Sequence, residues 1–284
     1  MSTDAAPSTY NRQPWDRQPW DGLRRFTDAR IALGRAGHSL PTAAHLQFQL
    51  AHAQARDAVH VPLDTDRLIQ GLQAQGFETL KLHSAAPHRH VYLQRPDLGR
   101  RLNEAACSTL QAQLQRPCEQ DPHAPAPDVC FVVADGLSAL AVHSHAIEFL
   151  QCLLPQLQRD ANPWRVAPVC VVEQGRVAIG DDIGERLAAK LVVVLIGERP
   201  GLSSPDSMGI YLTWAPRVGC TDAQRNCISN VRGAGLAPQA AALQLHHLMR
   251  QARSLKLTGV ALKVEVQVEM LALNATVSSV ATLG

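Results

Sequence analysis

The chain has 284 residues, of which 46% are hydrophobic, 18% charged and only 4% aromatic, and its formal net charge is +2. This apolar fraction is sufficient for a folded core, the length allows one or two domains, and the small charge gives no argument for a nucleic-acid or membrane partner. The apolar runs, such as residues 191–197, are far shorter than the roughly 20 residues of a membrane span, and the first twenty residues lack the apolar stretch of a secretory signal.

Seven cysteines are present, which is an odd number, and none of them forms a Cys-x-x-Cys pair. Several lie inside apolar runs, where cysteine behaves as a small hydrophobic residue. Reduced thiols and a cytoplasmic location are therefore expected.

Residues 1–21 are predicted to form a disordered tail, because they are polar and contain prolines. The sequence Arg-Gln-Pro-Trp-Asp occurs twice in this tail, at residues 12–16 and again at residues 17–21. Such an aromatic repeat can act as a docking peptide, but an unconstrained tail is the simpler interpretation.

Residues 22–116 are predicted to form a mainly helical domain. A first helix is expected over Ala43–Val59, which contains neither glycine nor proline. A second is expected over Asp64–Gln75, with Gly76 as its stop signal.

A short extended stretch is expected at His90–Gln94, after which Asp97 caps a third helix that runs to about Gln115. The segment Pro117–Pro127 contains four prolines in eleven residues, a composition that disfavours helix and central strand. This segment marks the predicted boundary between the helical domain and an α/β domain at residues 128–260.

Beyond the boundary, apolar runs of strand length alternate with helical segments. Strands are expected at Val129–Val133, Val166–Val172, Leu191–Ile196 and Gly209–Trp214, and helices at 137–157, Asp181–Lys190 and Ala237–Lys256. This pattern is typical of a mostly parallel sheet with helices on both faces. The predicted fold class is therefore α/β, with a mainly helical N-terminal region followed by a Rossmann-like domain. Residues 261–284 are expected to form a C-terminal extension.

Ligands of such sheets bind beyond the carboxyl ends of the strands. The polar segments that follow the predicted strands should gather at this edge. They are Asp135–Ser138, Gln174–Val177, Gly197–Asp206 and Arg225–Asn230.

Nucleotide-binding motifs are weak in this sequence. Gly233–Pro238 is the nearest match to the dinucleotide fingerprint, but it lacks the third glycine and follows a helix-like segment. Gly175–Gly180 has the glycine spacing of a P-loop, but Asp181 and Asp182 follow it and would repel phosphate. A stand-alone nucleotide-binding α/β enzyme is therefore only an alternative function.

Metal-binding and catalytic patterns are equally sparse. The twelve histidines include neither His-x-x-x-His nor His-Glu-x-x-His. Cys227 could act as a nucleophile with His246 or His247 as its base, but nothing in the sequence fixes that geometry. Glu198 directly follows an apolar strand and stands beside Arg199. It is either one partner of a surface ion pair or a carboxylate that accepts hydrogen bonds from a ligand.

Several segments occur together in an order and spacing that point to a family. They are residues 29–37, 92–101, 135–138, 175–177, 182–184, 196–202 and 227–230. From about residue 22 to about residue 258 the chain resembles the small (light) subunit of ethanolamine ammonia-lyase. The resemblance implies an adenosylcobalamin-dependent lyase that converts ethanolamine to acetaldehyde and ammonia by radical chemistry. It also implies a hetero-oligomer in which a large subunit holds the substrate and this chain, active only with that subunit, closes over the cobalamin.

Carried over residue by residue, the resemblance assigns cobalamin contacts to Val177, Glu198 and Cys227, and no catalytic residue or metal ligand to this chain. All three lie on segments expected at the sheet edge. The Asp-x-His-x-x-Gly motif, through which many cobalamin proteins ligate the cobalt, is missing, and Asp121–Ala126 is its nearest match. Base-on cobalamin, with a cobalt that this chain does not ligate, is therefore expected.

The location that the family implies is the cytoplasm or a bacterial microcompartment. Plain cytoplasm is favoured, because the Arg-Gln-Pro-Trp repeat does not form the amphipathic helix of a targeting peptide. A non-catalytic scaffold subunit is a further alternative, and no nucleic-acid or membrane partner is expected.

Overall fold

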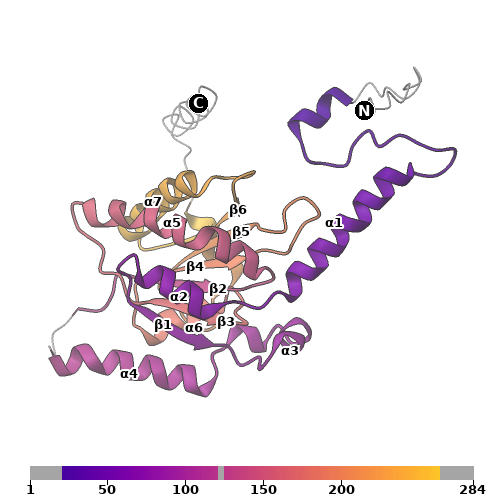
Figure 1. Ribbon diagram of the computed structural model, residues 1–284. Coiled ribbons are helices and arrows are strands. Elements are labelled where there is room, and N and C mark those ends of the chain that lie inside the picture. Colours follow the sequence, from indigo (N-terminus) through magenta and orange to yellow (C-terminus); the bar gives the residue numbers. More distant parts are fainter. Residues whose placement is uncertain (1–20, 121–124, 263–284) are drawn as a thin grey trace, which may run out of the picture.

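The computed structural model describes residues 21–120 and 125–262 (Figure 1). Residues 1–20 of the predicted tail, residues 121–124 of the proline-rich segment and residues 263–284 of the predicted extension lie outside the described residues. Within the described ranges, no helix has the length and apolar character needed to cross a bilayer.

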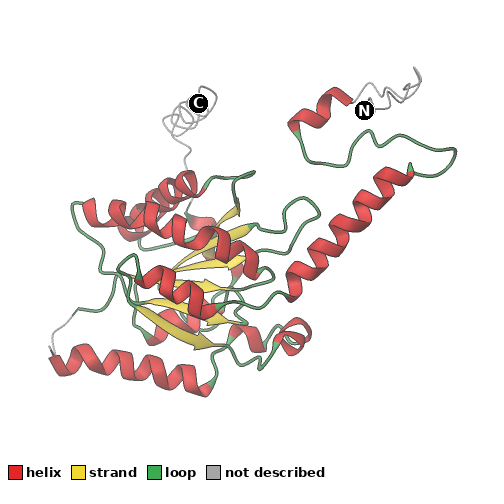
Figure 2. Cartoon of the chain, viewed as in Figure 1, coloured by secondary structure: helices red, strands yellow, loops and turns green. Residues whose placement is uncertain are grey.

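The fold is mixed α/β and is built on one six-stranded sheet (Figure 2). The α-helices are α1 (Thr42–His60), α2 (Thr65–Gln73), α3 (Arg89–Gln94), α4 (Glu104–Gln120), α5 (Ala139–Arg159), α6 (Ile179–Arg186) and α7 (Pro238–Leu255). The strands are β1 (Thr79–His83), β2 (Val129–Ala134), β3 (Val169–Glu173), β4 (Leu191–Gly197), β5 (Met208–Trp214) and β6 (Arg225–Val231).

The strand order is β1-β3-β2-β4-β5-β6. The first four strands in this order are parallel, whereas β5 is antiparallel to both β4 and β6. Strand β6 therefore runs in the same direction as the parallel strands. The sheet is mostly parallel, as the sequence predicted.

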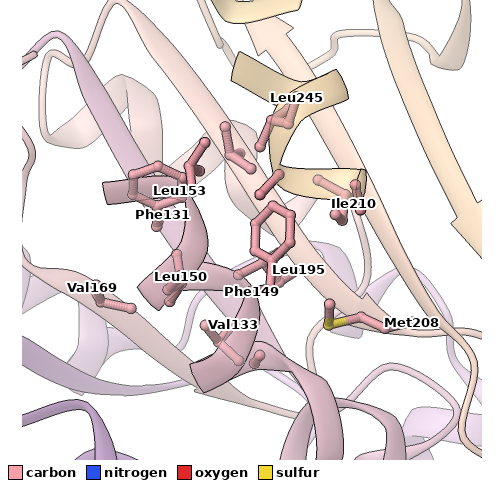
Figure 3. Close-up of a cluster of buried hydrophobic side chains, with 14 of the residues drawn as sticks. Phe131, Val133, Phe149, Leu150, Leu153, Val169, Leu195, Met208, Ile210 and Leu245 are labelled. Atoms are coloured by element: carbon pink, nitrogen blue, oxygen red, sulfur yellow. The ribbon is translucent and has the colours of Figure 1, made fainter. Parts of the chain in front are cut away.

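The strands β2 and β4 are buried along their whole length, which explains why their sequences are continuous apolar runs. One face of the sheet packs against α2, α5 and α7. Figure 3 shows Phe149 and Leu153 of α5 among the side chains of Phe131, Leu195 and Leu245 in this core.

The opposite face packs against α4 and α6. Helix α6 lies very close to β4, because a Cβ atom on Gly180 would come within 2.4 Å of a Val194 methyl group. The close approach explains why glycine occupies this position of the helix. Helix α1, in contrast, extends away from the sheet and buries only Ala51 and Ala58 (Figure 1).

The predicted extended stretch at His90–Gln94 is wrong, because these residues belong to helix α3. The side chain of His88 caps this helix, and its Nδ1 atom accepts a hydrogen bond from the Val91 amide at 3.5 Å. Tyr92 on α3 is completely buried, so tertiary packing stabilises a helix too short to form alone.

The predicted start of the third long helix at Asp97 is also wrong. Helix α4 begins at Glu104, after Asn103, whose Oδ1 atom accepts a hydrogen bond from the Ala106 amide at 2.8 Å. Asp97 instead forms an ion pair with Arg95 at 2.7 Å. At its other end α4 continues into the predicted boundary segment as far as Gln120.

The segment Arg225–Asn230, predicted as a loop, is part of strand β6. It pairs with β5, so that Tyr211 lies opposite Cys227. Because β5 is antiparallel to its neighbours, the loop that follows it lies at the opposite edge of the sheet. The expectation of a fourth loop at the carboxyl edge was therefore wrong, although the last residues of β6 do reach that edge.

Strand β1 precedes the proline-rich segment and was not predicted. It pairs in parallel with β3, so the chain before residue 116 contributes an edge strand to the sheet. The division of the chain into domains at 22–116 and 128–260 stays a prediction.

Candidate functional site

Val177, Glu198 and Cys227 are associated with the sheet face that carries α6. Strand pairing places Val194 opposite Tyr211 and Tyr211 opposite Cys227. Residues that lie opposite each other in an antiparallel pair share a face of the sheet. The side chains of Val194, Tyr211 and Cys227 therefore all lie on the α6 side. Val177 and Tyr211 pack against the hydrophobic core of this side. Cys227 is exposed, so the outer strands carry an accessible surface next to α6.

Glu198 follows β4 directly and is half-buried. Its Oε2 atom accepts hydrogen bonds from the Ser207 hydroxyl at 2.5 Å and from the Asn230 amide at 3.4 Å. Within the described part of the chain, its Oε1 atom has no donor, and the carboxylate forms no ion pair with Arg199 or another cation. The surface ion pair between Glu198 and Arg199 is therefore not formed, and Oε1 of Glu198 can accept a hydrogen bond from a ligand.

Tyr211 connects Glu198 with Cys227. A Cβ atom on Gly209 would lie 3.0 Å from Oε1 of Glu198 and 3.2 Å from the Tyr211 ring. The Tyr211 side chain also forms a hydrogen bond with the Cys227 side chain. The carboxylate, the phenol and the thiol thus form one small polar patch across β4, β5 and β6.

The Cys227 thiol is not set up as a nucleophile. Desolvation against the sheet raises its pKa, and the nearby Glu198 carboxylate adds to the rise, although the hydrogen bond with Tyr211 lowers it. His246 and His247 belong to α7, which packs on the other face of the sheet. A neutral thiol without a histidine base does not support a nucleophilic role for Cys227.

Val177 lies in the turn between β3 and α6, and this turn is fixed from two sides. The Gly175 amide donates a hydrogen bond to Oδ1 of Asp135 at 3.0 Å. The buried Tyr92 hydroxyl donates to the Gly175 carbonyl at 3.1 Å. The chain therefore holds the backbone next to Val177 in one conformation.

The carboxyl ends of β2 and β3 are joined by Arg89. Its Nη1 atom contacts Oδ2 of Asp135 at 3.3 Å, the Gly136 carbonyl at 2.8 Å and Oε1 of Gln174 at 3.4 Å. Burial raises the pKa of Asp135 to about 6, although the Arg89 guanidinium opposes this rise. The Arg89 guanidinium also lies 4.8 Å from the Tyr92 ring centre. Sequence reasoning found the Asp135 loop but missed Arg89.

A cavity of about 560 Å³ adjoins Val177. Its walls include Arg100, Arg101, Arg176, Asp181 and Arg225. Arg225 and Asp181 form a buried pair in which Nη1 and Nη2 each contact one carboxylate oxygen at 2.6 Å. Arg225 lies on β6 two residues before Cys227, so the side chains of both residues are on the α6 face of the sheet.

A second cavity, of about 730 Å³, lies at the amino ends of β2 and β4. Asp128 is paired there with Arg165 at 2.8 Å, with Lys190 at 3.0 Å and with Arg253 at 3.5 Å, so one carboxylate is shared by three cations. None of the predicted site residues borders this cavity. Among the described residues, no three histidine, cysteine, aspartate or glutamate side chains are grouped to hold a metal ion.

Comparison with known proteins identifies the family. The family model described as ethanolamine ammonia-lyase light chain (EutC) matches residues 17–263. The chain is 56% identical over 269 residues to an ethanolamine ammonia-lyase small subunit of Azotobacter vinelandii, covering 95% of this chain and 94% of the relative. A small subunit of Pseudomonas aeruginosa is 57% identical over 271 residues, with coverage of 95% and 94%. One of Ralstonia nicotianae is 54% identical over 268 residues, with coverage of 94% of each chain. The resemblance is thus confirmed, and the chain belongs to the ethanolamine ammonia-lyase light-chain family.

Proposed function

We propose that this chain is the small subunit of an adenosylcobalamin-dependent ethanolamine ammonia-lyase, which converts ethanolamine to acetaldehyde and ammonia. In this proposal a large subunit holds the substrate, and the small subunit closes over the cobalamin with the α6 side of its sheet. The observation that supports this role is that Tyr211 connects Glu198 with the exposed Cys227 on the face of the sheet against which Val177 also packs.

The residues of this surface fit the chemistry of a corrin ring. A corrin is a broad ring whose rim carries amide groups, and it needs apolar contacts together with acceptors for the amide N–H groups. Val177 supplies an aliphatic contact, and Oε1 of Glu198 is an acceptor that the described residues leave free. Tyr211 and Cys227 supply a small polar surface beside Glu198, on β5 and β6.

When bound, the cofactor supplies radical chemistry through its cobalt–carbon bond. The residues of this chain have a positioning role in the proposal. Ser207 and Asn230 orient the Glu198 carboxylate, and Tyr92 and Asp135 hold the turn next to Val177. No residue of this chain is assigned a proton transfer, and we propose that the cofactor binds base-on, with a cobalt that the chain does not ligate.

We further interpret the unit from β2 to β4 as Rossmann-like, because α5 and α6 lie on opposite faces of three parallel strands. The proposed setting is a hetero-oligomer in the cytoplasm, either free or within a bacterial microcompartment. The non-catalytic scaffold remains the alternative against which the cofactor proposal is tested.

Reconstitution tests this function. We expect the purified chain with adenosylcobalamin to have no ammonia-lyase activity, and to gain it when the large subunit is added. We also expect the complex to retain the visible absorption of the corrin through gel filtration. A complex that assembles but retains no corrin would instead support the scaffold alternative, and robust turnover by this chain alone would contradict the division of roles.

A further inference from the structure

The cavity next to Val177 has an excess of positive charge that internal ion pairs do not remove. Asp181, on α6, is paired with Arg225. Asp182, its neighbour, accepts a hydrogen bond from Nε of Arg186 at 2.6 Å. These two acids of α6 are therefore already paired with other cations, and Glu185, the third acid of the helix, accepts a hydrogen bond from the Val218 amide at 2.9 Å.

Arg176 also lines the cavity, but its Nη2 atom donates to the Tyr92 carbonyl at 3.3 Å and its guanidinium lies 4.3 Å from the Tyr92 ring centre. Arg100 and Arg101 are the cavity arginines that remain. Both are exposed, and their side chains have no hydrogen-bond or ion-pair partner within the ranges that the structure describes. Asp222, the other acid of the cavity wall, is fully exposed and faces Arg225 at 3.5 Å. The cavity thus offers two unpaired guanidinium groups beside the surface that carries the proposed corrin contacts.

The backbone that carries these two arginines is firmly attached to the site. The Leu102 amide donates to Oδ2 of Asp182 at 3.1 Å, and the Ala85 amide donates to the Arg101 carbonyl at 2.8 Å. The Arg176 amide donates to the Gly99 carbonyl at 2.7 Å, which ties the segment to the turn of Val177. A fixed backbone lowers the entropic cost of presenting arginines to a ligand.

Gly99 makes this attachment possible. A Cβ atom at this position would lie 2.8 Å from Cγ of Arg176 and 3.0 Å from the Tyr92 ring. The matched segment 92–101, which the corrin contacts leave without a role, therefore brings Arg100 and Arg101 to the cavity that Val177 borders.

We propose that Arg100 and Arg101 bind the phosphodiester in the nucleotide loop of adenosylcobalamin. This inference rests on the proposed function, since it assigns a second part of the same cofactor to a neighbouring part of the same surface. The phosphodiester is the anionic group of the cofactor, and the planar guanidinium is the side chain best suited to bind phosphate. The cavity adjoins the proposed corrin surface, because Val177 borders the cavity and Arg225 in its wall lies on β6 two residues before Cys227.

The test compares two cofactors that differ in the nucleotide loop. Adenosylcobinamide has the corrin and the adenosyl group but lacks the phosphodiester, the ribose and the lower base. For the complex reconstituted with its large subunit, we expect Arg100→Ala with Arg101→Ala to raise the dissociation constant of adenosylcobalamin about tenfold or more. The dissociation constant of adenosylcobinamide should remain unchanged. Arg250→Ala, an exposed arginine on α7 at the other face of the sheet, is the matched control and should alter neither constant.

Two further variants keep the result interpretable. Arg100→Lys with Arg101→Lys preserves charge and should lose less affinity for adenosylcobalamin, even if the alanine variants do not assemble. Glu198→Ala should weaken both cofactors equally, because it acts on the corrin rim. Weakening of both cofactors by the arginine variants, or of neither, overturns the phosphodiester assignment while the Glu198 result stands. No effect of Glu198→Ala on either cofactor would count against the corrin surface itself.

Discussion

Replacement of Glu198 by alanine removes the acceptor that is central to the proposed corrin surface. In the structure Oε2 is occupied by Ser207 and Asn230, whereas Oε1 has no donor within the described ranges. If Oε1 accepts an amide hydrogen bond from the corrin rim, loss of this charge-assisted bond costs roughly 1.5–3 kcal/mol. At about 1.4 kcal/mol per factor of ten, the dissociation constant of the cofactor should rise about 10- to 150-fold.

The same substitution leaves the Ser207 hydroxyl and the Asn230 amide without their acceptor, so some loss of stability is expected as well. Glu198→Gln separates the two effects, because it keeps an acceptor of nearly the same shape and should weaken the cofactor less. Cofactor titration of the reconstituted complex, followed by its visible spectrum, gives the dissociation constant, and a melting curve gives the stability. Glu78→Ala, an exposed glutamate before β1, serves as the control. An unchanged dissociation constant for Glu198→Ala in an intact complex would remove Glu198 from the site.

Three other perturbations address the thiol, the buried acid at the sheet edge and the buried ion pair. Cys227→Ser should retain substantial activity and mainly weaken cofactor binding, because a hydroxyl keeps the size and hydrogen bonding of the thiol; a loss of several orders of magnitude at saturating cofactor would indicate thiol chemistry. Burial raises the pKa of Asp135 to about 6 from an ordinary value of 3.8. The folded state therefore binds this proton more tightly than the unfolded state, and stability should fall by up to about 3 kcal/mol as pH rises from about 4 to about 6. Urea titrations at pH 4.5 and 7 should show about 2 kcal/mol of this loss in the native chain and not in Asp135→Asn, and equal losses in both would refute the shift. Asp181→Ala leaves the buried Arg225 guanidinium without its partner and should destabilise the chain by about 3–5 kcal/mol in urea; a loss below about 1 kcal/mol would mean that water or another acid replaces the carboxylate.

The central strands were predictable because burial on both faces gives an unambiguous sequence pattern. Leu191–Ile196 and Val129–Val133 coincide with β4 and β2 to within one residue at each end. The outer strands lack this signal. Thr79–His83 in β1 is only partly buried, and Arg225–Val231 in β6 contains polar residues that face solvent. Such short edge strands are stabilised by pairing with a neighbour, which no local pattern reveals.

Some residues of the candidate site could likewise be predicted from the sequence, and others could not. The position of Glu198 after an apolar strand identified it as a residue at the sheet edge, while Val177 and Cys227 came from the family resemblance. Arg225 was not singled out, because its partner Asp181 lies 44 residues away in the sequence. The contact of Tyr92 with Gly175 spans 83 residues. Long-range contacts of this kind depend on the folded arrangement, so they had to come from the structure.

Hydrogen exchange of the reconstituted complex, with and without adenosylcobalamin, tests most directly whether the cofactor binds at the α6 side of the sheet. We expect the cofactor to slow amide exchange in the Val177 turn, in the segment after β4 that contains Glu198, and in β6 around Cys227. Residues 160–166, at the amino-end cavity, should exchange at the same rate in both states. Protection confined to residues 160–166, or to the large subunit alone, would contradict the proposed site.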